Sequence, residues 1–470
     1  MERKLFTACF LTIALGYIGL FLNDIRQQDT WGDRDFLPLL VFGISLLLIH
    51  VWLVLFRVKA DPTFLGTVVF LGGFGILAQH RMGLFDLEHP WRLGHFAYPI
   101  GIVLMLVTSI LFRGSRIKAL KHLGWLAGLL SLLTLVGLLL TGTRYRGAYY
   151  ASGQITPTEI LKLLMVLFVA SYMAGREKNI RKTLEGKGGT SITLMMFPVY
   201  LVFGLLMGLL ILQRDLGMMM LLAMMLCLVL FFVTGQWRYV MVSLCGLITA
   251  GWLAGQWLTH ARIRIQTWLD PFEDPTGAGW QILQGLSGMF AGGMLGAGFG
   301  MGNPERIPIA ESDFIYAVIG EELGFAGCLV LVTFYLIFFH QSFRIAFHCK
   351  DLFGSILAAG LASIWACQTL LNLGGVTKAI PMTGIPLPLV SHGGSNLVTV
   401  FIGLGLMLSL SESGGHYPQA KKADGKKSSP RRRHSPCSKG VSADVIPTRY
   451  YQISSSSKCS LKNAIMRLRP

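Results

Sequence analysis

The sequence predicts an all-α polytopic membrane protein with about 12 transmembrane helices and one long extracytoplasmic loop. Of its 470 residues, 53% are hydrophobic and 14% are charged, whereas soluble globular proteins carry about 25% charged residues. The mean hydropathy is +0.57. Twelve apolar runs are long enough to cross ~30 Å of hydrocarbon as helices. They lie near 5–22, 37–56, 63–80, 97–112, 123–140, 158–174, 192–212, 216–233, 240–258, 314–339, 353–376 and 395–411.

The Lys and Arg residues predict the orientation of these helices. The formal net charge is +17, and 13 Lys and Arg residues against two Asp residues beyond Gly415 place about +11 of it in the tail. The links 113–122 and 175–191 are the most basic, and both follow even-numbered runs, as the tail does. The positive-inside rule therefore puts both termini in the cytoplasm. Basic residues beside membrane segments suit anionic lipid, so we expect membrane contact and no nucleic acid.

The stretch His260–Gly324 is the one long polar interruption, and we interpret its first part, 259–313, as an external loop. The loop carries six acids and three arginines, Arg262 and Arg264 among them. At its end Asp313 precedes an apolar helix, with Ser312 as the expected N-cap. Glu321 and Glu322 follow about 12–14 Å further along that helix. Adjacent acids at that depth are costly, and one is a candidate to face the bundle interior.

Two charged clusters stand at the starts of other apolar runs. Glu159 and Lys162 are three residues apart, a spacing that lets them pair on one helix face. Each charge would cost ~2.5–3.5 kcal/mol at mid-membrane, so we expect either a structural ion pair or a wet cavity. Arg214 and Asp215 break two apolar runs, either as a tight external hairpin or as part of a site.

The segment 380–395 contains three prolines and three glycines beside membrane helices, which indicates a re-entrant or broken segment. Such backbone is tolerated only where it lines a cavity or is buried in protein. A lone histidine such as His392 is more often structural than catalytic. The eight cysteines form no C-x-x-C pair, and no zinc, phosphate-loop or nucleophile-elbow motif occurs. Any chemistry must then rest on carboxylates, with Arg and Lys for anionic groups.

Several motifs together closely resemble the SEDS proteins, the RodA/FtsW-like shape, elongation, division and sporulation proteins of bacteria. The resemblance covers roughly residues 123–411, and the two additional N-terminal helices would extend a family core of about ten. The motifs are Asp313-Phe314-Ile315-Tyr316-Ala317-Val318-Ile319-Gly320-Glu321-Glu322-Leu323-Gly324, Gly384-Ile385-Pro386-Leu387-Pro388 with Ser391-His392-Gly393-Gly394-Ser395, Asp274-Pro275 with Gly279-Trp280-Gln281, Gln213-Arg214-Asp215-Leu216-Gly217, and Thr156-Pro157-Thr158-Glu159 with Lys162.

This resemblance implies a peptidoglycan glycosyltransferase of the bacterial cytoplasmic membrane that polymerises lipid II, an undecaprenyl pyrophosphate-linked disaccharide, together with a class B penicillin-binding protein. It divides the chain into N-terminal helices (1–122) and a polymerase core (123–411). The remaining segment, 412–470, is rich in Lys, Arg, Ser and Pro, a composition that predicts a disordered cytoplasmic tail. The chain departs from the family patterns at several positions, which puts substrate contacts and partner pairing in question. These departures are Ile309, Glu311 and Ser312 before the aspartate, Arg214 for a proline, His392 for a tyrosine, and Arg146-Gly147-Ala148-Tyr149-Tyr150.

The resemblance implies that Asp313 is the catalytic residue. We expect it to act as general base on the acceptor sugar hydroxyl. Glu159, Lys162, Asp215, Arg262, Arg264, Glu321, Glu322, Ser391 and Ser395 are the predicted substrate-binding residues. The arginines, or a divalent cation such as Mg²⁺ or Mn²⁺, would neutralise the leaving pyrophosphate. A lipid II flippase, and a scaffold that only recruits the penicillin-binding protein, are the alternatives.

Overall fold

The computed structural model describes residues 2–27, 36–58, 60–82, 94–145, 148–150, 156–184 and 192–413. It confirms the predicted all-α polytopic fold, because the twelve apolar runs all fall on helices. One run, 192–212, is interrupted at Met196. Within the described ranges, eight helices are long and apolar enough to cross a membrane, and three shorter apolar helices accompany them.

The helices that carry the apolar runs are α1 (Glu2–Gln27), α2 (Leu37–Leu55), α3 (Pro62–Arg81), α4 (Gly94–Leu111), α5 (Gly124–Thr141), α6 (Thr158–Gly175), α8 (Ile192–Met195), α9 (Phe197–Gln213), α10 (Leu216–Thr234), α11 (Trp237–Trp257), α14 (Ile315–His348), α15 (Leu352–Val376) and α16 (Gly394–Ser413). Shorter elements connect them: η2 (Gly114–Leu123), α7 (Glu177–Leu184), α12 (Thr259–Leu269), α13 (Trp280–Gly292) and η3 (Pro304–Arg306). Between α5 and α6, the strands β1 (Thr143–Tyr145) and β2 (Ala148–Tyr150) pair antiparallel.

Three of the long helices begin at an aspartate that caps them. The carboxylate of Asp61 accepts the Thr63 N–H of α3 at 2.8 Å, and Pro62 follows it at the first helical position. Asp215 and Asp351 cap α10 and α15 in the same way. Because the first four N–H groups of a helix have no intrahelical partner, such caps define where the helix starts. The predicted break between the runs 192–212 and 216–233 is therefore confirmed.

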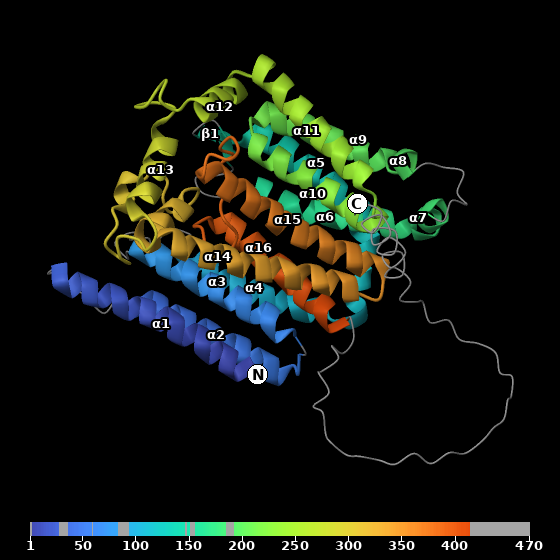
Figure 1. Ribbon diagram of the computed structural model, residues 1–470. Coiled ribbons are helices and arrows are strands. Elements are labelled where there is room, and N and C mark those ends of the chain that lie inside the picture. The colour runs from blue at the N-terminus through green and yellow to red at the C-terminus, as the bar shows by residue number, and fades with distance from the viewer. Residues whose placement is uncertain are drawn as a thin grey trace, which may run out of the picture. The chain divides into compact units, whose positions relative to one another are not determined.

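The most deeply buried helices, α3, α15 and α16, lie at the centre of the bundle. Helix α15 packs against α6, α10 and α14, and α16 packs along α4. Gly405 permits that last contact, since a Cβ there would approach the Met105 carbonyl oxygen to 2.5 Å. Close backbone approach at small residues is typical of helix packing in membranes. Helices α1 and α2 lie outside α3, along the lower edge of Figure 1.

The long polar stretch between α11 and α14 is not the structureless loop that its composition suggested. It contains α12, α13 and η3, in yellow at the upper left of Figure 1. Helix α13 packs against α14 and encloses a small apolar cluster that includes Ile282, Ile307 and Phe314. The sequence signal was weak because this cluster is assembled from separate segments rather than from one long apolar run.

A kink at Gly324, where φ is +66°, divides α14. Such a break leaves backbone groups without their helical partners, and the segment 293–298 supplies new ones. Ala297 N–H donates to the Glu321 carbonyl, and Phe325 N–H donates to the Gly293 carbonyl, both at 2.9 Å. The glycine-rich segment thus completes the hydrogen bonding of α14 at the kink.

Two predicted features lie outside the described residues. The basic tail predicted at 412–470 is one of them, apart from its first two residues. The second feature is Arg146 and Gly147, which belong to one of the departures from the family motifs.

Candidate active site

Asp313 lies in a turn directly before α14. The Ile309 carbonyl accepts the N–H groups of Ser312 and Phe314, at 3.2 and 3.3 Å. Ser312 does not cap α14 as predicted, because the helix begins after Phe314 without a side-chain cap. Its hydroxyl instead donates to Asp313 Oδ1 at 3.0 Å. The burial of Phe314 anchors the turn, and Asp313 itself remains partly exposed.

The turn is held from the opposite side by the predicted broken segment. Residues 380–393, between α15 and α16, form no helix. Ser391 Oγ donates to the Ser312 carbonyl at 2.6 Å, and His392 N–H donates to the Glu311 carbonyl at 2.7 Å. Ser391 therefore lies beside the Asp313 turn, where its hydroxyl donates a hydrogen bond to the backbone.

The surroundings of Asp313 disfavour its charged form. Burial raises the pKa of the Asp313 carboxyl, and the neighbouring Glu311 charge raises it further. The Ser312 hydrogen bond and the Arg264 charge oppose this rise in pKa without cancelling it. A carboxylate with a raised pKa is a stronger base than an ordinary aspartate, which is the property a general base needs.

The predicted pairing of Glu159 with Lys162 is present, and the Lys162 side chain is only 3% exposed. Lys162 Nζ also donates to Asn396 Oδ1 at 2.7 Å and to Gln368 Oε1 at 3.3 Å. The ammonium group thus uses a carboxylate and two amides as acceptors, which is how a buried charge is made tolerable. Substrate contact by this pair stays a prediction.

Asp215 interacts electrostatically with the Glu159–Lys162 pair. Its carboxylate caps α10 by accepting the Met218 N–H at 2.9 Å. Burial raises the pKa of Asp215, and the Glu159 charge adds to the rise, while the charges of Arg264 and Lys162 lower the pKa. The turn before α10 therefore lies within range of both the Lys162 pair and α12.

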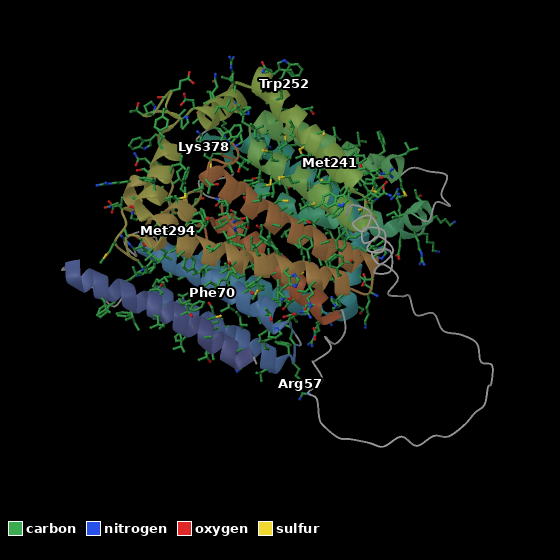
Figure 2. All side chains as sticks on the ribbon, in the orientation of Figure 1. Arg57, Phe70, Met241, Trp252, Met294 and Lys378 are labelled. Carbon is green, nitrogen blue, oxygen red and sulfur yellow. The ribbon has the colours of Figure 1, made fainter. Side chains whose placement is uncertain are left out.

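Arg264 connects α12 to the broken segment. Its Nη1 donates to the carbonyls of Met382 and Thr383, each at 3.1 Å. One turn further along α12, Trp268 Nε1 donates to the Lys378 carbonyl at 3.0 Å. Lys378 is labelled in Figure 2 at this end of the bundle. Arg262 is exposed on the same helix.

Glu321 and Glu322 lie away from the Asp313 turn. Asn303 N–H donates to Glu321 Oε1 at 3.0 Å, and Gly300 N–H donates to Glu322 Oε2 at 3.1 Å. Arg81, from the end of α3, pairs with Glu322 at 3.0 Å. These contacts bind the glycine-rich segment to α14 and α3. Their predicted role in substrate binding stays a prediction.

Sequence reasoning missed several polar residues that organise the site. Ser395 Oγ, which was predicted, accepts the Thr156 N–H at 3.1 Å. Gln368, Asn372 and Asn396 were not predicted, although all three are almost fully buried. Amides inside apolar runs were the available signal, because polar side chains are rare at such positions unless they serve a purpose.

An apolar groove of about 830 Å³ lies among α9, α10, α11 and α15. It extends to the end of α11, where Trp257 and Leu258 line it and α12 begins. Met241, labelled in Figure 2, marks α11 on this side of the bundle. The groove therefore ends next to the helix that carries Arg262 and Arg264. It offers long apolar surface beside a polar, cationic site.

Within the described residues, no group of three or more His, Cys, Asp or Glu side chains is arranged to hold a metal ion. The predicted alternative, a divalent cation that neutralises the leaving pyrophosphate, is not tested by this arrangement and stays a prediction.

The chain matches the model of the FtsW/RodA/SpoVE family, described as cell cycle proteins, over residues 40–415. It is 32% identical over 431 residues to the peptidoglycan glycosyltransferase RodA of Mycobacterium tuberculosis, covering 87% of this chain and 90% of that protein. It is 35% identical over 261 residues to the stage V sporulation protein E of Bacillus subtilis, covering 55% of this chain and 68% of that one.

Two solved structures share the fold. One was reported under "Structural coordination of polymerization and crosslinking by a peptidoglycan synthase complex", with a TM-score of 0.60 and 27% identity, over 75% of this chain and 98% of that one. The other is the rod shape determining protein RodA of Thermus thermophilus, with a TM-score of 0.54 and 25% identity, over 75% of this chain and 97% of that one.

Proposed function

Because this chain belongs to the FtsW/RodA/SpoVE family of cell cycle proteins, we propose that it is a peptidoglycan glycosyltransferase that polymerises lipid II. One observation of the structure carries the proposal. Asp313, with a raised pKa, is held in a turn by the broken segment, and that segment also binds Arg264 and adjoins the buried Lys162 pair. The broken segment therefore connects the proposed base with two cations at one end of an apolar helix bundle.

Asp313 acts as the general base in the proposed reaction. It takes the proton from the acceptor sugar hydroxyl as the hydroxyl oxygen forms a bond to the anomeric carbon of the donor. The bond between that carbon and the phosphate oxygen breaks, and its electron pair leaves with undecaprenyl pyrophosphate. No oxidant or reductant is needed. The raised pKa of Asp313 strengthens the base, provided that the carboxyl is ionised at the working pH.

Arg264 and Lys162 are the cations of the proposed site, and the charge of Arg264 lowers the pKa of Asp313. The guanidinium of Arg264 is oriented by its two carbonyl contacts, and we assign its remaining N–H groups to the pyrophosphate, since arginine suits bidentate contacts with phosphate. Arg262 is a second donor on the same helix. A divalent cation such as Mg²⁺ or Mn²⁺ is the alternative source of positive charge.

The apolar groove supplies the surface that a polyprenyl-linked substrate needs. Its lining along α9, α10 and α11 is almost wholly apolar, and it ends beside α12. We propose that the isoprenoid chain lies there while the pyrophosphate reaches the arginines. This arrangement favours the enzyme over a flippase, because the acid, the cations and the groove meet at one end of the bundle.

The multi-pass membrane location follows from the helices themselves, and we propose the bacterial cytoplasmic membrane with both termini on the cytoplasmic side. The basic elements η2 and α7 are at the ends of α5 and α6 away from Lys162, as the positive-inside rule requires for an external site. Arg57, labelled in Figure 2, lies at that opposite end.

A class B penicillin-binding protein is the proposed partner. The support is the similarity to a structure whose title names a complex that coordinates polymerization and crosslinking. For this chain, the partner would crosslink the strands that the Asp313 site polymerises.

The test is glycan-strand synthesis from lipid II by the purified full-length chain, with and without a class B partner whose crosslinking serine is disabled. We expect polymer that depends on this chain. Translocation of fluorescent lipid II across liposomes without polymer would support the flippase. Unchanged partner recruitment with no polymer under any condition would support the scaffold.

A further inference from the structure

Helix α15 carries two buried amides one helical turn apart, Gln368 and Asn372, both 0% exposed. Their helix is apolar along most of its length. A buried amide in such a setting is costly unless its donors and acceptors are satisfied. The hydrogen bonds of the two side chains therefore identify the backbone segments that the two amides position.

Asn372 uses both of its N–H donors on backbone carbonyls. Nδ2 donates to the Asp313 carbonyl at 3.0 Å and to the Ile385 carbonyl at 2.8 Å. Two carbonyl acceptors fix the orientation of the amide, because its oxygen in that place would face two other oxygens. One side chain, 59 residues from Asp313 in the sequence, thus joins the peptide of the proposed base to the broken segment.

Gln368 makes the equivalent contacts on the other side of the site. Its Nε2 donates to the Pro386 carbonyl at 2.8 Å and to Asn396 Oδ1 at 2.9 Å, and its Oε1 accepts from Lys162 Nζ at 3.3 Å. The two amides therefore hold adjacent carbonyls of the broken segment, those of Ile385 and Pro386. One of them continues to Asp313, and the other continues to Lys162.

The spacing between the base and the buried cation is consequently set by one rigid helix. Residues four apart on a helix lie on the same face, with a rise of about 6 Å between them. Ser391 also bonds to the catalytic turn, but it belongs to the broken segment itself. Asn372 is anchored in a helix that packs against α6, α10 and α14.

We propose that Asn372 is a positioning residue for glycosyl transfer. Together with Gln368, one turn away on α15, it sets the distance between Asp313 and Lys162. This inference rests on the proposed function. Asn372 touches no reacting atom. Its contribution is to keep the Asp313 peptide within the tolerance that transfer requires, and misplacement of a reacting group by about 1 Å can cost about 100-fold in rate.

The decisive variants are Asn372→Leu, which keeps the approximate size and removes both donors, and Asn372→Gln, which keeps the donors on a longer arm. Matched controls on the same buried helix are Ser363→Ala and Thr369→Val. Ser363 is fully buried, and Thr369 bonds only to the carbonyl one turn earlier, at 2.9 Å. Both controls alter buried polar groups of α15 away from the broken segment.

Each variant is assayed as full chain with the crosslinking-disabled partner, for kcat, KM for lipid II, and thermal unfolding. For Asn372→Leu we expect kcat to fall about 10- to 100-fold, with KM within about twofold. Asn372→Gln should lose less, and the controls should keep kcat within about twofold. If the Leu variant does not fold, the Gln variant decides, with a kcat loss of at least about threefold expected.

The double variant with Asp313→Asn separates positioning from general support. Acting through the base, Asn372→Leu should cause no further loss once Asp313 cannot take a proton. Wild-type kcat in both Asn372 variants, a loss confined to KM, or losses that multiply in the double variant would overturn the inference. An active Asp313→Asn single variant would instead overturn the proposed chemistry itself, independently of Asn372.

Discussion

The replacement Asp313→Asn tests the proposed base most directly. Asn retains the size of the side chain and an oxygen that can accept the Ser312 hydroxyl bond, but it cannot take a proton. Removal of a general base typically lowers the rate about 10²- to 10⁴-fold, which corresponds to about 2.7–5.4 kcal/mol of transition-state stabilisation at 1.36 kcal/mol per tenfold. We therefore expect almost no polymer and unchanged binding of lipid II.

The same replacement should not destabilise the fold. Burial raises the pKa of Asp313, so the folded chain holds this proton more tightly than the unfolded chain does. The stability that this difference contributes is complete below the unfolded pKa and is lost as the pH rises through the folded pKa. Above the folded pKa the ionised carboxylate therefore gives the fold no such support, and the neutral Asn variant should melt there at the same or a higher temperature.

The assay is strand synthesis from lipid II, with binding and thermal unfolding measured on the same preparation. Asp270→Asn is the matched control, because this exposed aspartate of the same polar stretch accepts the Phe272 N–H at 2.9 Å, a bond that Asn can also accept. The control should retain full activity. Near-normal polymer from a folded Asp313→Asn variant would refute the assignment of the base.

Three further sets of variants test the charge beside the base, the buried ion pair and the packing of α13 against α14. Glu311→Gln removes a neighbouring charge that raises the pKa of the base, so the acidic limb of the pH profile of kcat/KM should move to lower pH; an unmoved limb contradicts this. Lys162→Ala should abolish most activity by leaving the Glu159 carboxylate without its partner, and exchange of the two charges should restore stability more than polymerisation. Gly292→Ala places a Cβ 2.0 Å from a carbonyl oxygen of α14, so we expect a lower melting temperature, whereas Gly204→Ala, with open space around it, should be neutral.

The elements that the sequence predicted well were those whose signal is local. Apolar runs of sufficient length define the membrane helices regardless of their neighbours. The Glu159–Lys162 pair follows from helical spacing, and the break before α10 follows from its charged residues. The prolines and glycines of 380–393 likewise predicted a segment without regular helix.

The contacts that assemble the site could not be read in the same way, because they join distant segments. Asn372 meets the Asp313 peptide 59 residues away, and Ser391 meets Ser312 79 residues away. Ser312 was misassigned as a helix cap for a related reason. Its sequence position suits a cap, but the tertiary bond from Ser391 and the turn at Ile309 start α14 two residues later than a cap at Ser312 would.

Strained backbone conformations could not be predicted from the sequence, and they indicate where the fold is most constrained. Ile309 and Leu389 adopt positive φ, at 53° and 67°, a conformation that a non-glycine residue avoids and that is rarest for a β-branched one. Each costs of the order of 1–3 kcal/mol and persists only where its surroundings over-determine it. One residue lies in the turn of the proposed base, and the other in the segment that holds this turn.

The restraints around Leu389 come from helices outside the polar stretch 260–324 and the broken segment, or from their far ends. Tyr335 of α14 donates to the Pro388 carbonyl at 2.5 Å, and Gln79 of α3 donates to the Val390 carbonyl at 2.9 Å, on either side of Leu389. The broken segment is thus fastened from α3, α14 and α15 together. Arg264 of α12 adds a further attachment at the Met382 and Thr383 carbonyls, so we expect the substrate to reach a broken segment that is already in place.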